Sequence, residues 1–180
     1  VELTLLAAPG DVEVVLFPLD DDAADLEAAT AAALTVLGDF CYSTDGSSLA
    51  EVVITRAIAA GERIATAESC TGGMIAEALT DVPGASGAYV GGVVAYANEV
   101  KIEALAVPPG LIAQFGAVSE ETARAMADGA LALPGATLAV ATTGIAGPDG
   151  GTAGKPVGLV WIALGVAGGP VTASAHKLRG

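Results

Sequence analysis

The chain has 180 residues, of which 53% are hydrophobic and only 4% aromatic, so it can bury one substantial core made mainly of small aliphatic side chains. Its formal net charge of −14 repels nucleic-acid phosphates, and nucleic-acid binding is therefore disfavoured. No apolar run approaches the roughly 20 residues that cross a bilayer, and two cysteines do not suggest a disulfide framework, so we expect neither a membrane protein nor a disulfide-stabilised one.

The sequence begins at Val1 without a basic leader or a cleavage signal, and we expect a cytoplasmic protein with reduced thiols. The missing initiator methionine suggests a processed chain or a fragment. Acidic residues concentrate at 20–22 and Asp25, a pattern typical of a solvated turn that leads into a helix. The glycine and the ligand set of a calcium loop do not follow them, so this cluster does not predict a metal site.

The first part of the chain predicts a small α+β segment. Its expected elements are a strand, a second strand, a helix and one more short strand, at residues 2–8, 12–17, 23–37 and 40–42. A Pro-Gly-Asp turn signal between the first two strands indicates a hairpin, and Gly38 closes the helix. Because these elements make a thin core, we interpret residues 1–42 as half of a small domain or a docking arm, and the polar residues 43–47 as a linker.

The second part, residues 48–180, predicts an α/β domain. It opens with a capping box in which the side chains of Ser48 and Glu51 satisfy helix N–H groups reciprocally. Helices are expected at residues 49–60, 72–79, from 98 onward, 111–115 and 119–131, and strands at residues 63–67, 88–97, 137–143, 159–166 and 171–177. Strands alternate with helices and finish in an antiparallel pair. This order predicts a three-layer α/β/α domain around a mixed sheet, with residues 88–97 as a central strand.

The most informative segment is residues 67–73 (AESCTGG), where an apolar run gives way to small polar residues and two glycines. A strand that ends here and a helix that begins near Gly72, with Thr71 as its N-cap, would expose Ser69 beside unpaired helical N–H groups. Such groups stabilise a phosphate or a developing oxyanion. Taken alone, however, the segment fits an ordinary capped turn better than an active site.

Three polar or glycine-rich clusters are expected at the carboxyl ends of the strands, where ligands collect in such a sheet: residues 68–73, 96–101 and 142–151. Ser86, in the loop before the strand at 88–97, is expected to reach the same rim. The third cluster contains enough glycine for its backbone N–H groups to surround an anion. It matches neither a nucleotide-triphosphate loop nor a dinucleotide fingerprint.

Ser69 and Lys101 are the candidate nucleophile and base. Lys101 lies near a predicted helix start, and both the positive helix end and partial burial favour its neutral amine. A Ser–Lys pair carries out acyl transfer without histidine. The only histidine, His176, lies in a late β segment and is interpreted as a structural residue. Lys101 also fits a solvated helix residue paired with Glu99 or Glu103, and the pattern alone leaves that alternative open.

The remaining candidates each have a structural alternative. Cys70 is a second possible nucleophile but has no histidine partner nearby, so we expect a small buried thiol. Glu68 is either a base or a strand-end carboxylate bonded to backbone N–H groups. Tyr96 either orients Lys101 or the substrate, or forms part of the core rim. No cluster has metal-ligand spacing, and we expect a mechanism without metal or cofactor.

Several motifs, in the same order, resemble the CinA carboxy-terminal domain, the family of the bacterial nicotinamide mononucleotide deamidase. They are residues 67–73 (AESCTGG), 82–86 (VPGAS), 96–101 (YANEVK), 116–119 (GAVS), 143–151 (TGIAGPDGG) and 155–158 (KPVG). The resemblance covers roughly residues 48–180. Residues 1–47 resemble the end of the middle region of full-length CinA proteins, which would make residues 1–42 a partial segment of a middle domain.

The resemblance implies hydrolysis of the carboxamide of nicotinamide mononucleotide to nicotinic acid mononucleotide and ammonia, in pyridine-nucleotide salvage, by a homodimer. Ser69 would be the nucleophile and Lys101 its base. Ser86, Tyr96 and Thr143 would orient the substrate or relay protons. The oxyanion would meet N–H groups near residues 71–73, and the phosphate would use the loop at 144–151. The implied substrate-binding positions are Glu68, Thr71, Gly72, Gly73, Thr143, Gly144 and Gly147.

A second interpretation is a non-catalytic module, either a nucleotide-binding regulator or a competence-related interaction domain attached to an upstream enzyme. Ligand binding without turnover would favour it. Ammonia release that disappears in both Ser69→Ala and Lys101→Ala, while the variants remain folded, would favour the amidohydrolase.

Overall fold

The computed structural model describes residues 1–8, 10–19 and 23–178, and the chain divides into two units, Val1–Ser47 and Ser48–Gly180. The boundary falls directly after the polar residues 43–47. Pro9 of the predicted hairpin turn and the predicted acidic turn at 20–22 lie outside the described residues. Within those residues, no helix is both long enough and apolar enough to cross a membrane.

The first unit consists of a hairpin and a helix. Its elements are β1 (Glu2–Ala8), β2 (Asp11–Phe17) and α1 (Ala23–Leu37), and the two strands pair antiparallel as predicted. The strand predicted at residues 40–42 is wrong: Gly38–Phe40 forms a 3-10 turn, because the Cys41 N–H donates to the Gly38 carbonyl and tightens the end of the helix. None of the described residues of this unit is buried, so by itself it has no core.

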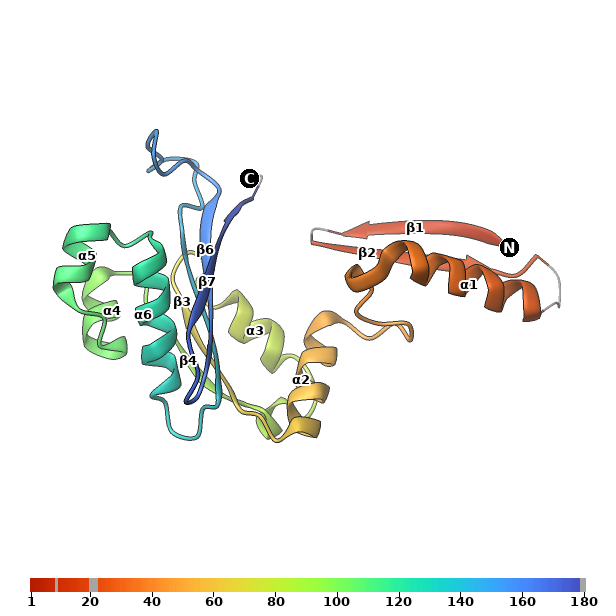
Figure 1. Ribbon diagram of the computed structural model, residues 1–180, viewed down its shortest axis with the longest axis horizontal. Coiled ribbons are helices and arrows are strands. Elements are labelled where there is room, and N and C mark those ends of the chain that lie inside the picture. The colour runs from red at the N-terminus through yellow and green to blue at the C-terminus, as the bar shows by residue number, and fades with distance from the viewer. Residues whose placement is uncertain (9, 20–22, 179–180) are drawn as a thin grey trace. The chain divides into compact units, whose positions relative to one another are not determined.

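The second unit contains a five-stranded mixed sheet in the order β4-β3-β5-β6-β7. The strands are β3 (Ile64–Glu68), β4 (Tyr89–Val94), β5 (Leu138–Gly144), β6 (Leu159–Val166) and β7 (Thr172–Lys177). The helices are α2 (Leu49–Ala60), α3 (Met74–Thr80), α4 (Asn98–Leu105), α5 (Pro109–Phe115) and α6 (Glu120–Leu131). Strand β3 is parallel to both β4 and β5, and the last two pairs are antiparallel. Helices α4, α5 and α6 cover one face and α2 and α3 the other, which confirms the predicted three-layer α/β/α domain (Figure 1).

Strand β4 lies at the edge of the sheet, so the prediction of a central strand at residues 88–97 is wrong. Ile64 pairs with Tyr89 but Ala65 pairs with Gly91, which leaves Val90 as an extra residue in a bulge. A Cβ on Gly92 would lie 2.0 Å from the Thr66 hydroxyl, so this strand approaches β3 too closely for a side chain there. The residues at 88–97 are apolar because helices cover both faces of this strand. The same composition would occur whether or not another strand paired with its free edge.

Small side chains allow the helices to pack closely against the sheet. The main core cluster combines buried residues of α6 with alanines of β3, β5 and β6: Ala123, Met126, Ala127 and Ala130 with Ala65, Ala67, Ala139, Ala141 and Ala163. A Cβ on Gly129 would lie 2.2 Å from the Leu105 carbonyl oxygen, which shows how closely α6 approaches the end of α4. This packing fixes the strand ends from which the site is built.

Candidate active site

The carboxyl ends of β3, β4 and β5 meet at one edge of the sheet, because the three strands are parallel. Glu68, the last residue of β3, is in register with Val94 on one side and with Thr142 on the other. A pocket of about 190 Å³ opens at this edge, and its walls come from the strand ends, the segments after them and the turn between α5 and α6: Ser69, Cys70, Lys101, Ala117, Thr143 and Ala146. All three predicted clusters contribute to the lining of this pocket.

Lys101 and Ser69 meet inside this pocket, although 32 residues separate them in the sequence. Lys101 Nζ lies 3.1 Å from Ser69 Oγ, 2.7 Å from the carbonyl oxygen of Ala95 and 3.1 Å from that of Tyr96. The chain leaves β4, turns at residues 95–97 and enters α4, so the first turn of α4 directs Lys101 back toward the strand end. Lys101 is 1% exposed and Ser69 8%, so the alternative of a solvated lysine paired with a glutamate is wrong.

Burial lowers the pKa of Lys101, and the neighbouring Cys70 and Glu99 offset this effect only in part. The surrounding groups also match the neutral amine. A neutral amine has two N–H groups and one lone pair. For a neutral amine, the carbonyls of Ala95 and Tyr96 can accept the two N–H groups, which leaves the lone pair facing the Ser69 hydroxyl. The geometry therefore suits a base that removes the hydroxyl proton.

Glu68 caps helix α3 from the end of β3. Its carboxylate is 1% exposed and accepts hydrogen bonds from the backbone N–H groups of Gly73, Ile75 and Ala76, at 3.0, 3.0 and 2.8 Å. Helix α3 begins at Met74, and its N-cap Gly73 has φ of 105° and offers no side chain, so the prediction of Thr71 as N-cap is wrong. Because the carboxylate already occupies these donors, neither Glu68 nor the Gly73 N–H is available to bind substrate.

Hydrogen bonds also hold the turn that carries Ser69. The Ser69 N–H donates to the Thr142 carbonyl at 2.9 Å, and the Gly72 N–H donates to the Ser69 carbonyl at 3.1 Å. The hydroxyls of Thr71 and Thr142 are 2.8 Å apart. Thr71 and Gly72, predicted to bind substrate, are therefore structural parts of the turn. Thr142 supports this turn from β5, a role that its sequence position alone does not reveal.

Cys70 follows Ser69 in this turn and lines the pocket. Burial raises the pKa of the Cys70 thiol, and the backbone N–H groups of Cys70 and Thr71, which approach its sulfur, offset this only in part. A thiol with a raised pKa is a poor nucleophile at neutral pH, in agreement with the expectation of a structural cysteine.

The opposite wall comes from the turn between α5 and α6. Thr143 is buried and its hydroxyl donates to the Ala117 carbonyl at 2.7 Å, while the hydroxyls of Ser119 and Thr122 donate to the Gly116 carbonyl at 3.0 and 2.8 Å. Thr143 thus positions this wall. Ala117 has no chemical signature in the sequence, because this wall is made of backbone and small apolar side chains; only its place in the GAVS motif marks it.

Gly144 lies in the pocket as predicted. A Cβ there would be 2.7 Å from the Leu159 carbonyl and 3.0 Å from the Cys70 sulfur, so the position excludes a side chain. Gly147 does not line the pocket; Ala146 does. Tyr96 is 77% exposed at the pocket mouth, and its backbone carbonyl, not its hydroxyl, contacts Lys101.

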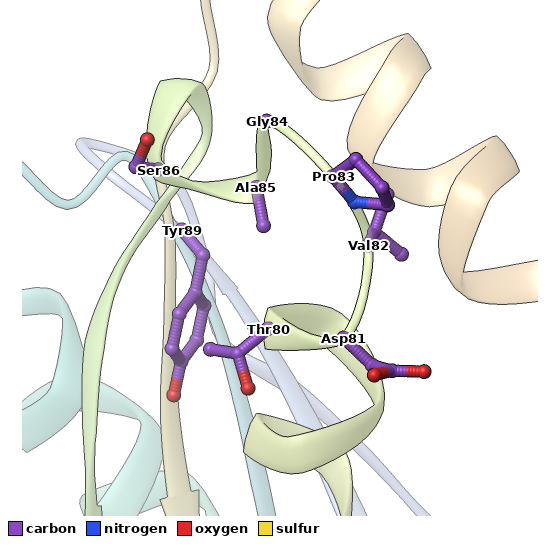
Figure 2. A pocket seen from close by; sticks show the side chains of 8 residues that line it. All are labelled: Thr80, Asp81, Val82, Pro83, Gly84, Ala85, Ser86 and Tyr89. Atoms are coloured by element: carbon purple, nitrogen blue, oxygen red, sulfur yellow. The ribbon is translucent and has the colours of Figure 1, made fainter.

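Ser86 does not belong to this pocket. It lies in the turn Ala85–Gly87 before β4, at the strand end where Tyr89 pairs with Ile64, the first residue of β3. There it lines a second, larger hollow of about 440 Å³ together with Asp81 and Tyr89 (Figure 2). The expectation that Ser86 reaches the same rim is wrong for this chain, because a loop that precedes a parallel strand lies at the amino edge of the sheet. Over the described residues, no group of three or more His, Cys, Asp and Glu side chains is placed to hold a metal ion.

Comparisons with known proteins agree with this architecture. The family model of the CinA C-terminal domain matches residues 46–180. A CinA-like protein from Mycobacterium marinum is 48% identical over 180 residues, which cover 99% of this chain and 42% of that protein. A CinA-like protein from Akkermansia muciniphila is 44% identical over 168 residues, which cover 93% and 40% of the two proteins. The chain therefore spans about two fifths of the length of these relatives.

Solved structures show the same fold. The crystal structure of the competence/damage inducible protein CihA from Agrobacterium tumefaciens has a TM-score of 0.71 and 45% identity, and the match covers 76% of this chain and 83% of that one. A CinA superfamily protein from Escherichia coli has a TM-score of 0.71 at 32% identity, and the match covers 80% and 86% of the two chains. These similarities establish the architecture, and they leave the chemistry to be argued from the pocket.

Proposed function

This chain belongs to the CinA C-terminal domain family, and from that premise we propose that residues 48–180 hydrolyse the carboxamide of nicotinamide mononucleotide to nicotinic acid mononucleotide and ammonia. The observation that carries the proposal is the buried contact between Lys101 Nζ and Ser69 Oγ, 3.1 Å long. A nucleophile and a base at hydrogen-bond distance, with the base oriented by two carbonyls, form the arrangement that covalent acyl transfer requires.

In the first half of the proposed reaction, the neutral amine of Lys101 accepts the proton of Ser69 as Oγ attacks the carboxamide carbon. The carbonyl oxygen becomes an oxyanion, which backbone N–H groups of the turn that carries Ser69 would stabilise. The Lys101 ammonium then gives its proton to the amide nitrogen. The C–N bond breaks, ammonia leaves, and a nicotinoyl ester remains on Ser69.

In the second half, Lys101 removes a proton from water, and the resulting hydroxide attacks the ester carbon. The tetrahedral intermediate collapses, and the Ser69 oxygen leaves with the proton from Lys101. The product carries a carboxylate in place of the amide, and the enzyme returns to its starting state. One water is consumed and one ammonia released, so no redox or phosphoryl-transfer partner is required.

The pocket suits a ring-sized group. Its volume of about 190 Å³ is below the roughly 300–1,000 Å³ of sites that enclose a drug-sized ligand. Its walls include the small apolar residues Ala117, Val118 and Ala146, against which a flat pyridine ring can pack. The ribose and phosphate would then extend out of the pocket.

The direct test is an assay of ammonia release by the purified chain with nicotinamide mononucleotide, in parallel with Ser69→Ala and Lys101→Met. The methionine has a similar length but no amine. Turnover by the wild type and its loss in both variants, with thermal unfolding showing that both remain folded, supports the proposal. Unchanged turnover in either variant contradicts the Ser–Lys mechanism, and absence of turnover in the wild-type chain contradicts the proposed activity.

A further inference from the structure

The proposed substrate carries a phosphate, and a chain of net charge −14 must provide a place for it. The amino terminus of α3, where helical N–H groups could otherwise hold a phosphate, is filled by the Glu68 carboxylate. A second anion there would meet a buried negative charge and no free donors. The phosphate therefore requires a cation elsewhere on the pocket rim.

The seven basic residues can be sorted by position. Lys101 is buried at the pocket floor and Arg124 is paired with Glu120 on α6. The others are Arg56 on α2, Arg63 directly before β3, Lys155 in the loop between β5 and β6, Lys177 on β7, and Arg179, which lies outside the described residues. Arg63 precedes a parallel strand and so lies at the amino edge of the sheet, and Lys177 lies two strands away from β5. Lys155 is left as the described cation beside the pocket wall.

The contacts of Lys155 place its ammonium next to that wall. Its Nζ donates to the Phe115 carbonyl at 2.6 Å, at the end of α5. A Cβ added to Gly116 would lie 2.9 Å from this Nζ, and the next residue, Ala117, lines the pocket. The lysine side chain thus crosses from the glycine-rich loop to the α5–α6 turn, next to a residue of the pocket wall.

The backbone of Lys155 is fixed while its head group keeps spare donors. The N–H and carbonyl of Lys155 both bond to Thr152, at 3.2 and 2.8 Å, in a closed turn. An ammonium has three donors, and the Phe115 carbonyl uses one of them. Among the described residues no carboxylate pairs with Lys155. It can therefore bind an oxyanion with its remaining donors without breaking an ion pair.

We propose that Lys155 binds the phosphate of the substrate and thereby makes this site prefer the nucleotide to the corresponding nucleoside. This inference rests on the proposed function, and it adds a specificity-determining residue outside the Ser69–Lys101 pair. Because the chain carries a net charge of −14, a local positive charge such as that of Lys155 is needed for a net attraction of the phosphate.

The experiment measures kcat/KM for nicotinamide mononucleotide and for nicotinamide riboside, and compares their ratio among variants. In Lys155→Gln the ratio should fall by about tenfold or more, mainly through a higher KM for the nucleotide, as expected for the loss of a charge-assisted hydrogen bond. Lys155→Arg should keep most of the preference. Arg56→Gln on α2 removes the same charge away from the pocket and should leave the ratio unchanged. An unchanged ratio in Lys155→Gln overturns the proposal.

A binding measurement separates this inference from the proposed reaction. Calorimetry with both compounds on the wild type and on Lys155→Gln does not depend on turnover. Tighter binding of the nucleotide by the wild type, lost in the variant, supports the role of Lys155 even if no ammonia is released. Equal binding of the nucleotide by both proteins, or no binding by either, contradicts it.

Discussion

Two hollows lie at opposite ends of the paired strands β3 and β4, and they differ in a way that volume does not reveal. The hollow at the amino end, about 440 Å³, is the larger, but its Asp81 and Ser86 are exposed to solvent. The pocket at the carboxyl end, about 190 Å³, contains Ser69 and Lys101, both buried. Removal from water lowers the pKa of Lys101. The smaller pocket is therefore the candidate active site, because buried polar groups that converge on one point are better evidence for it than a large volume.

The largest expected effect concerns the Ser69–Lys101 pair. Ser69→Ala and Lys101→Met should each lower kcat by about 10³-fold or more, and the double variant should be no worse than the more damaged single variant, because the two residues act as one unit. Steady-state ammonia release measures all three. If the fold-losses in kcat of the two single variants multiply in the double variant, the two side chains act independently. That result would contradict a Ser69–Lys101 pair that works as one unit.

The second effect is the pH dependence of the carboxyl-end pocket. The neutral form of Lys101 is the active one, so kcat/KM should rise about tenfold per pH unit below the pKa of Lys101 and level off above it. Because burial lowers this pKa, the plateau should begin below the ordinary lysine value of 10.5. A rate that falls with rising pH over the same range would contradict the assignment of Lys101 as base.

The same pKa shift affects folding stability. The unfolded chain binds a proton on Lys101 up to pH 10.5, whereas the folded chain releases it at lower pH. The stabilisation linked to this residue is therefore present above 10.5 and disappears as pH falls through the lowered value. In Lys101→Met this contribution to the pH dependence of the free energy of unfolding should be absent, which denaturation at several pH values can measure.

An intermediate effect is expected at Glu68, which holds the reactive turn at this end of the sheet. In Glu68→Gln one carboxylate oxygen becomes an NH₂ group that faces backbone donors, so kcat should fall about 10- to 100-fold and stability by about 1–3 kcal/mol. KM should change less, since the substrate does not contact this side chain. Glu77→Gln on the exposed side of α3 is the matched control. Equal activity of the two variants would show that the cap does not position Ser69.

The smallest effect is expected at the larger hollow. Ser86→Ala should leave kcat/KM within about twofold of the wild type, because an exposed hydroxyl at the opposite strand end does not contact the reacting atoms. A loss of tenfold or more would contradict a pocket completed within one chain. If mixing Ser86→Ala with Ser69→Ala then restored activity, Ser86 would act on the pocket of a second copy, as in a homodimer.

The sequence was sufficient wherever the determining chemistry is local. Ser48 and Glu51 form the predicted capping box, and α2 has the predicted bounds 49–60. The helix predicted at 119–131 begins one residue later, because Ser119 is its N-cap and accepts from the Thr122 N–H. These signals involve residues within a few positions of each other, so single motifs fix them. The bounds of β6, Leu159–Val166, are those predicted. Gly158 directly precedes this strand and Gly168 follows it by two residues, so the signals for both ends are local.

Features that depend on neighbours distant in the sequence were not predicted. Strand β4 is an edge strand because it pairs only with β3. An apolar run has the same composition in an edge strand and in a central strand, so the sequence does not distinguish them. The cap of α3 comes from Glu68 in the preceding strand, where capping rules that search adjacent Ser or Thr residues pointed to Thr71. The prediction for Ser86 is wrong because the order of the motifs in the sequence does not say whether a motif lies at the amino or the carboxyl edge of the sheet.

The covalent intermediate provides the most direct test of the central claim. The wild-type chain, mixed with nicotinamide mononucleotide and quenched in acid within the first turnovers, would be digested and its peptides analysed by mass spectrometry. The account predicts a nicotinoyl ester on Ser69, absent in Ser69→Ala. Release of ammonia at the wild-type rate by Ser69→Ala, or an ester found on Cys70 instead, would contradict it.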